Sequence, residues 1–246
     1  MGHKNNGIFL SIIIPAYNEE RRICETLEKV SRFLADKSYK YEIIVVDDGS
    51  KDRTCEAVNR FRQKCHGLRI ISNSVNSGKG YSVKNGILNS KGEYVLFSDA
   101  DLSTPIEEVE KLLYSLRDGC EVAIGSRALP DSDLQVRQPL FRHCMEKLFG
   151  CFVRLLVIGG IRDSQCGFKA FTRGTAREIF SRQRISGFSF DAELLFIAKK
   201  RGLGIKEVPV IWRNSRETKL NIFIDGAKML IELIKIRINS LRGFYK

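Results

Sequence analysis

The sequence predicts an α/β protein in which a mostly parallel sheet is flanked by helices on both faces. Short runs of β-branched and apolar residues alternate with longer segments of helical periodicity. Polar or glycine-rich loops follow five of these runs, and 246 residues are enough for one large domain of this kind. Since ligands of open parallel sheets bind beyond the carboxyl ends of the strands, these loops predict where the site lies.

The first half of the chain predicts four strand and helix units in succession. The expected strands cover residues 9–14, 41–46, 69–72 and 94–98, and a fifth follows at 121–124. The expected helices cover residues 18–36 and 52–64, with a third opening at 76–80 and ending near 89, and a fourth starting at Pro105. Asn18 is placed to cap the first of these helices.

The pattern changes after residue 128. We expect a polar loop over 129–136, helices over 139–158, 175–181 and 190–200, and a last strand over 205–212. The segment 139–158 fits either a core helix with a solvated basic side or an interfacial helix that meets lipid. The predicted division is a disordered stretch at 1–8, one domain over 9–219 and an amphipathic helix over 220–246. That helix either lies on a membrane surface or docks on the domain.

The composition limits the class of partner. Lys and Arg number 41 against 29 acidic residues, a net charge of +12 that favours nucleotides, lipid phosphates or an anionic membrane. The basic residues are spread along the chain without an aromatic stacking platform, so we expect no nucleic acid partner. Seven scattered cysteines indicate reduced thiols. The polar first residues and the lack of a long apolar run predict neither a signal segment nor a spanning helix.

Two acids separated by one small residue, Asp99 and Asp101, follow the expected fourth strand. In an extended backbone, residues two apart point to the same side, so both carboxylates can face one point beyond the strand. Hard oxygen ligands of this kind suit Mg²⁺ or Mn²⁺, with substrate phosphates completing the shell. Taken alone, the same acids also suit the cap of the next helix. At the third helix, Gly78, Lys79 and Gly80 offer free backbone N–H groups and a cation for phosphate.

Six short motifs, in this order along the chain, carry a resemblance to a known family. They occupy residues 14–19, 47–50, 76–80, 99–101, 163–169 and 190–195. Over residues 10–220 the chain resembles the family 2 glycosyltransferases of GT-A fold, which is Rossmann-like, and within them the polyprenyl-phosphate sugar synthases. The last two motifs look like those of the dolichyl-phosphate β-glucosyltransferases, which use UDP-glucose. They are less similar to those of the mannosyl enzymes, which use GDP-mannose.

The resemblance implies roles for residues around the nucleotide and the metal. It places Pro15, Tyr17 and Glu19 around the uracil or ribose, Asp47 near the base edge with Gly49 and Ser50 in the same turn, and Lys79 and Lys219 on the donor. It also implies a metal held by Asp99 and Asp101, with Ser103 at the position where the mannosyl relatives tend to carry Gln.

The resemblance also implies how the acceptor phosphate is held. Arg127, Arg142 and Arg213 match positions that grip phosphate in the mannosyl relatives, and Arg offers planar, bidentate donors to phosphate oxygens. A lipid phosphate is mostly dianionic near neutral pH because its second pKa is about 6, so it needs little help from a base. Asp191 matches the general base of relatives with a hydroxyl acceptor. In this chain three roles stay open for Asp191: the general base, a residue that orients a sugar hydroxyl, or the cap of its helix.

The function implied by the resemblance is an inverting transfer of glucose from UDP-glucose to a polyprenyl or dolichyl phosphate, with Mg²⁺ or Mn²⁺. The alternatives are the same transfer from GDP-mannose, a transfer to a saccharide hydroxyl, and a membrane-associated nucleotide-binding protein without catalysis. We expect a cytoplasmic protein that attaches peripherally to the cytoplasmic face of a membrane through amphipathic helices and basic charge.

Overall fold

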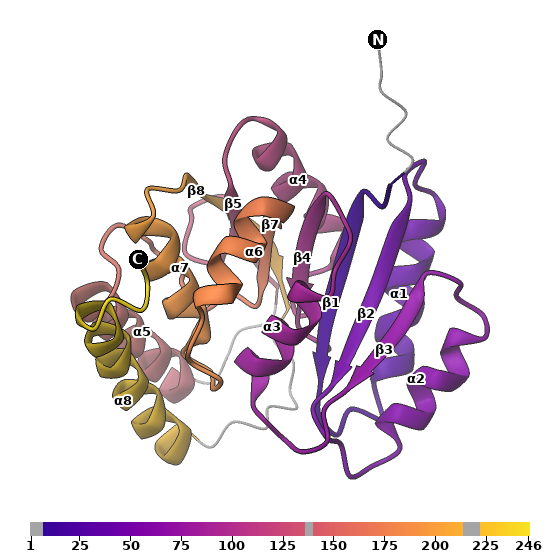
Figure 1. Ribbon diagram of the computed structural model, residues 1–246, viewed down its shortest axis with the longest axis horizontal. Coiled ribbons are helices and arrows are strands. Elements are labelled where there is room, and N and C mark those ends of the chain that lie inside the picture. Colours follow the sequence, from indigo (N-terminus) through magenta and orange to yellow (C-terminus); the bar gives the residue numbers. More distant parts are fainter. Residues whose placement is uncertain (1–6, 136–139, 214–221) are drawn as a thin grey trace.

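The computed structural model describes residues 7–135, 140–213 and 222–246, and its centre is a seven-stranded sheet (Figure 1). The strands are β1 (Leu10–Ala16), β2 (Tyr41–Asp47), β3 (Leu68–Ser72), β4 (Tyr94–Ser98), β5 (Val122–Ser126), β7 (Phe168–Thr172) and β8 (Ile205–Pro209). They lie in the order β3-β2-β1-β4-β7-β5-β8. Every pair is parallel except those that β7 makes with β4 and β5. The predicted mostly parallel sheet is confirmed.

Helices cover both faces of the sheet (Figure 1). One apolar core is shared with α1 (Ile23–Ala35), α2 (Thr54–Arg62), α4 (Val109–Arg117) and the short 3₁₀ helix η1 (Ile106–Glu108). The other is shared with α3 (Lys79–Leu88), α5 (Leu140–Leu156), α6 (Arg173–Arg182), α7 (Phe190–Lys200) and α8 (Ile222–Leu241). Along β1, Ile12 and Ile14 face the first core and Ile13 faces the second. Burial on both faces explains why β1 is a continuous apolar run.

Strand β7 was not expected from the sequence. Its residues, Phe168–Thr172, carry Lys169 at the second position, and this charge interrupts the apolar pattern by which a central strand is recognised. The Lys169 side chain is nevertheless fully buried. The structure therefore places a lysine in the interior strand layer, where such residues are almost never found unless they are paired.

The expected strand 205–212 is two strands that belong to different sheets. β8 joins the central sheet, whereas β9 (Ile211–Trp212) pairs with β6 (Asp133–Leu134) in a separate two-stranded sheet. β6 falls within the segment that was expected to be a polar loop. Two-residue strands give too short a pattern to be read from sequence.

The prediction that Asn18 caps the first helix is wrong. The N-cap position of α1 is Arg22, and no side chain caps it. Asn18 instead adopts a left-handed backbone with φ 54°. Its side-chain oxygen accepts a hydrogen bond from the Lys51 backbone N–H at 2.8 Å. Asn18 thus ties the loop after β1 to the loop after β2.

Helix α8 docks on the domain through one face. Leu233 and Ile236 are buried in the second core, and so is Tyr245, which follows the helix. The Tyr245 hydroxyl donates a hydrogen bond to Oε1 of the buried Glu193 at 2.5 Å. Within the described ranges, no helix is both long and apolar enough to cross a membrane. The six described cysteines are all free thiols.

Candidate active site

The loops singled out in the sequence meet at one edge of the sheet. The carboxyl ends of β1, β2, β3, β4 and β5 share this edge because these strands are mutually parallel in direction. Since β7 runs the opposite way, its first residue lies at the same edge, opposite Ser98 at the end of β4. The loop 163–167 is thereby brought against the acids that follow β4.

The donor-binding residues predicted after β1 and β2 lie in adjacent, linked loops. The backbone N–H of Asn18 donates to the Ser50 hydroxyl at 2.9 Å, and the Ser50 N–H lies 3.3 Å from Oδ1 of Asp47. Glu19 pairs with the Arg22 guanidinium, with Nη2 and Oε1 2.8 Å apart. Pro15 lies within β1, and Tyr17 follows it directly. The structure brings this predicted group together.

Asp48 organises the loop that leads into α3, a role that sequence reasoning missed. Its carboxylate accepts hydrogen bonds from Asn73 Nδ2 at 2.8 Å and from the backbone N–H groups of Ser77 and Gly78, each at 2.9 Å. Gly49 stands next to it with φ +69°, and a Cβ there would lie 2.7 Å from the Val75 carbonyl carbon. The signal in the sequence was the doubled acid before a glycine, of which only the first acid had been given a role.

The start of α3 is held by the loop between α6 and α7. The Ser186 carbonyl accepts hydrogen bonds from the N–H groups of Gly80 at 2.8 Å and Tyr81 at 3.3 Å. The N–H of Gly78 is engaged by Asp48. The expectation that Gly78 and Gly80 offer free N–H groups to phosphate is therefore wrong. Of the groups predicted to bind phosphate at this helix start, the side chain of Lys79 remains, and it pairs with Asp99.

Charged side chains alternate in sign from the β4 loop into the protein interior. Lys79 Nζ lies 2.5 Å from Asp99 Oδ1. Burial disfavours the charged ammonium, but nearby carboxylates, chiefly Asp99 and then Asp191, outweigh burial and raise the pKa of Lys79. Behind Lys79, the Asp191 carboxylate pairs with the Lys169 ammonium. Lys169 Nζ also donates to the Cys166 carbonyl at 2.6 Å.

Asp191 is 3% exposed and lies in the first turn of α7, whose N-cap is Ser189. The capping role considered for Asp191 is thus not the one it has. Burial raises the pKa of Asp191 against the opposing effect of the Lys169 ammonium. The Asp191 carboxylate faces the ammonium groups of Lys169 and Lys79, so in this conformation it balances the charge of both lysines.

The residues present fit a divalent metal ion next to a ligand that supplies further oxygens. Asp99 Oδ1 is buried and, apart from its ion pair, accepts no hydrogen bond. A Cβ at Gly167 would collide with the Asp99 carboxylate, so glycine leaves it room. Asp101 Oδ1 accepts the Ser103 N–H at 3.0 Å. In the part of the chain that is described, no three His, Cys, Asp or Glu side chains form a metal cluster. Two carboxylates completed by ligand phosphate are a common arrangement for Mg²⁺.

Burial and the adjacent Asp99 carboxylate raise the pKa of Asp101. A positive ion at this position would offset that repulsion. The loop is held by a hydrogen bond from Thr26 Oγ1 to the Ala100 carbonyl at 2.5 Å, and Leu102 within it has a left-handed φ of 45°. Such a constrained backbone over a pair of acids is typical of functional sites.

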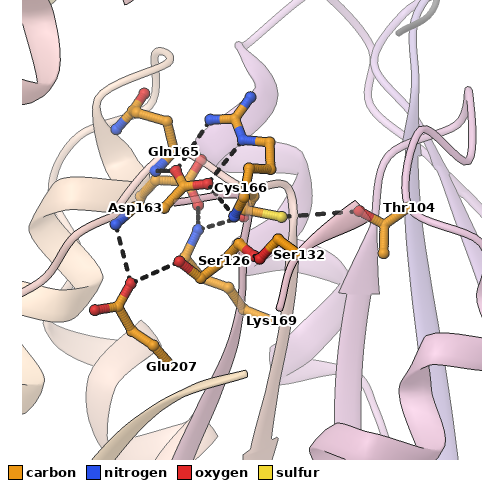
Figure 2. A network of polar contacts seen from close by, with 10 residues as sticks. Thr104, Ser126, Ser132, Asp163, Gln165, Cys166, Lys169 and Glu207 are labelled. Atoms are coloured by element: carbon orange, nitrogen blue, oxygen red, sulfur yellow. Dashed lines mark hydrogen bonds and ion pairs between the residues drawn. The ribbon is translucent and has the colours of Figure 1, made fainter. Parts of the chain in front are cut away.

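Arg127, expected to grip phosphate, is locked in a bidentate pair with Asp163. Nε lies 2.7 Å from Oδ2 and Nη2 lies 3.0 Å from Oδ1. Burial opposes the charged carboxylate, but the Arg127 guanidinium prevails and lowers the pKa of Asp163 to about 2. Glu207 extends the network by accepting from the Ser126 hydroxyl at 2.9 Å and the Asp163 N–H at 3.0 Å (Figure 2). The guanidinium lies 5.4 Å from the ring centroid of Trp212.

Of the other cations predicted to bind phosphate, the structure describes the side chain of Arg213 but not those of Arg142 and Lys219. The Arg213 N–H donates to the Ser103 carbonyl at 2.7 Å, which joins the end of β9 to the loop of the two acids. Arg213 Nε donates to Gln135 at 2.8 Å. Arg142 belongs to α5, but its side chain and the whole of Lys219 lie outside the described residues.

Comparison with known proteins identifies the class to which this sheet edge belongs. The sequence profile described as Glycosyl transferase family 2 matches residues 11–180. The dolichyl-phosphate beta-glucosyltransferase of Dictyostelium discoideum is 39% identical over 253 residues, covering 98% of this chain and 77% of that protein. The human protein of the same name is 36% identical over 250 residues, covering 96% and 77%. The chain therefore belongs to glycosyl transferase family 2, as the motifs predicted.

Solved structures confirm the expected GT-A-like fold. Glucosyl-3-phosphoglycerate synthase from Mycobacterium tuberculosis, solved with Mn²⁺, UDP and glucosyl-3-phosphoglycerate, superimposes with a TM-score of 0.70 at 22% identity, covering 96% of this chain and 80% of that one. Mannosyl-3-phosphoglycerate synthase from Rubrobacter xylanophilus gives a TM-score of 0.70 at 18% identity, covering 96% and 74%. At these identities the likeness concerns the fold.

Proposed function

We propose that this protein transfers glucose from UDP-glucose to dolichyl or another polyprenyl phosphate, forming the lipid-phosphate β-glucoside and UDP. The observation that carries the proposal is the two-carboxylate seat beside Lys79, in a chain whose curated relatives are dolichyl-phosphate beta-glucosyltransferases over nearly its whole length. The neighbouring fold that was solved with UDP and Mn²⁺ is consistent with the same donor class.

The donor would lie across the ends of β1, β2 and β4. Pro15, Tyr17, Glu19, Asp47, Gly49 and Ser50 would contact the uridine, and Lys79 and Lys219 would contact the diphosphate. Asp99 and Asp101 would hold Mg²⁺ or Mn²⁺, and the ion would stabilise the charge that develops on the UDP leaving group. Ser103 supports Asp101 through its N–H, so its part in metal binding would be indirect.

In the reaction, a phosphate oxygen of the lipid attacks the anomeric carbon from the side opposite UDP. The new bond forms as the bond from that carbon to the UDP oxygen breaks, UDP leaves with the electron pair, and the configuration inverts. A dianionic phosphate needs no base, which agrees with the burial of Asp191 against Lys169. Arg213 and Arg142 would hold the acceptor phosphate. Arg127 would act from its pair with Asp163, by keeping loop 163–167 in place.

A lipid-borne acceptor requires work at a membrane surface. We propose that α5 and α8 attach the protein peripherally, on the cytoplasmic face, because both helices carry exposed leucines or isoleucines. Leu148 and Leu155 project from α5, and Ile231 and Ile234 project from α8. Helices of this composition bind in the interface plane of a bilayer.

The decisive experiment is a panel of nucleotide sugars incubated with Mn²⁺ and a short polyprenyl phosphate. UDP-glucose should give a glucolipid with the β configuration, assigned by NMR. If only GDP-mannose gives a product, the sugar that the protein transfers is mannose and not glucose. Transfer to a free saccharide with none to the lipid phosphate would overturn it.

A further inference from the structure

A groove of about 620 Å³ lies between α8 and the loop that joins α6 to α7. Arg184 and Ser186 line it from the loop, Lys235, Ile238 and Arg242 line it from α8 and its end, and Phe244 closes it. We call these six residues the basic groove. None of them is among the residues that we assign to donor, metal or acceptor, although the carbonyl of Ser186 holds the start of α3 next to Lys79.

The basic groove keeps an excess of positive charge. Among the described residues, the side-chain cations of Lys235 and Arg242 form no ion pair, and the Arg184 guanidinium lies over the Phe244 ring, 4.5 Å from its centroid. The carboxylate in the wall, Glu232, is turned back to accept the Ser189 N–H at 3.1 Å. Three cations against one carboxylate leave the groove positive, so it suits an anionic group, and guanidinium groups suit phosphate oxygens.

An exposed apolar row runs along α8 beside the groove. Ile231, Ile234, Ile238 and Leu241 are 55%, 54%, 41% and 88% exposed. Their spacing of three or four residues puts them on one face of the helix. Ile238 belongs both to this row and to the basic groove. A ligand that suits both surfaces carries a phosphate and apolar chains side by side.

We infer that the basic groove binds the phosphate headgroup of an anionic phospholipid, while the apolar row of α8 enters the acyl chains. The inference deepens the proposed membrane attachment and rests on it, by naming the lipid chemistry that is recognised. A peptide with acidic side chains alone would match the cations but would leave the four aliphatic side chains in water. A phospholipid covers both.

The test is vesicle flotation with phosphatidylcholine alone and with phosphatidylcholine mixed with phosphatidylglycerol. Lys235→Gln combined with Arg242→Gln should lower affinity for the mixed vesicles by roughly 30-fold, because each Lys or Arg at an anionic surface contributes about 1 kcal/mol. The matched control is Arg60→Gln with Lys64→Gln, which removes the same charge at and just after α2, at the opposite end of the molecule (Figure 1). Its effect should stay within about threefold, since charges beyond roughly 8 Å are screened. Both variants should keep the wild-type melting temperature.

Equal losses in the two variants, or no preference for the mixed vesicles, would overturn the groove inference and leave the membrane attachment standing. Absence of binding to either vesicle would overturn both. Tight binding of inorganic phosphate without vesicle binding would assign the groove to a soluble anion and also reject the inference. Because vesicle binding is measured without sugar, nucleotide or metal, a failure of glucose transfer leaves this result unaffected.

Discussion

The ammonium of Lys79 lies 2.5 Å from Oδ1 of Asp99, the carboxylate oxygen that otherwise lacks a hydrogen-bond partner. The lysine thus occupies the side of Asp99 to which a metal ion or a diphosphate would bind. We expect a metal ion to compete with Lys79 for Asp99, and the donor diphosphate to compete with Asp99 for Lys79. The first two predictions concern this rearrangement.

Replacing Asp101 by Asn should abolish metal-dependent transfer. We expect turnover to fall at least about a hundredfold, because a Lewis acid at the leaving group contributes several kcal/mol. Binding of Mn²⁺ in the presence of UDP, followed by electron paramagnetic resonance, should weaken in parallel. Asp118→Asn, an exposed acid at the end of α4, serves as the control and should leave both quantities unchanged. Wild-type turnover in Asp101→Asn would remove the proposed metal site.

Replacing Lys79 by Met should separate binding of the metal from binding of the nucleotide. Without the ammonium, Asp99 has no competing cation, so Mn²⁺ alone should bind several-fold more tightly. UDP should bind more weakly, because the diphosphate loses a positive partner. Isothermal titration of each ligand measures the two effects, with the exposed Lys91→Met as the control. Weakening of both ligands to the same degree would contradict a competition between Lys79 and metal.

Replacing Lys169 by Met should destabilise the fold through Asp191. Removing one partner of a buried ion pair leaves an uncompensated charge, which costs about 3–5 kcal/mol. Urea unfolding measures the loss. The double variant Lys169→Met with Asp191→Leu should recover a large part of it, because no buried charge is left unpaired. Additive losses in the double variant would show that the two side chains act independently.

The Asp163 and Arg127 pair should make stability depend on acid pH. The pKa of Asp163 in the folded protein, about 2, is below its ordinary value of 3.8. The pair therefore contributes roughly 2 kcal/mol above about pH 4, and this contribution is lost as the pH falls towards 2. Asp163→Asn should be less stable than wild type at neutral pH, and the difference in free energy of unfolding should shrink across that window. A difference that stays constant with pH would mean that the carboxylate charge has no part in it.

The sequence predicted the parallel half of this protein well because each strand there is an apolar run ended by polar loop residues. The positions of Asp99, Asp101 and Lys79 followed from strand direction alone. Two features could not be foreseen. β7 contains a buried lysine, and Lys169 becomes recognisable as interior only once Asp191, 22 residues further on, is known to face it. Similarly, the N–H groups of α3 are occupied by Ser186, a partner that only tertiary structure brings near.

β7, the antiparallel strand of the central sheet, also governs the order in which the strands can assemble. β5 forms ladders only with β7 and β8 within the described sheet, so no earlier strand holds it in place. While the ribosome makes the first five strands, β4 keeps an open edge and β5 has no partner. The open edge of β4, the strand that precedes Asp99 and Asp101, is therefore closed only after β7 has been made. Until then it presents the unpaired backbone that invites contact between nascent chains.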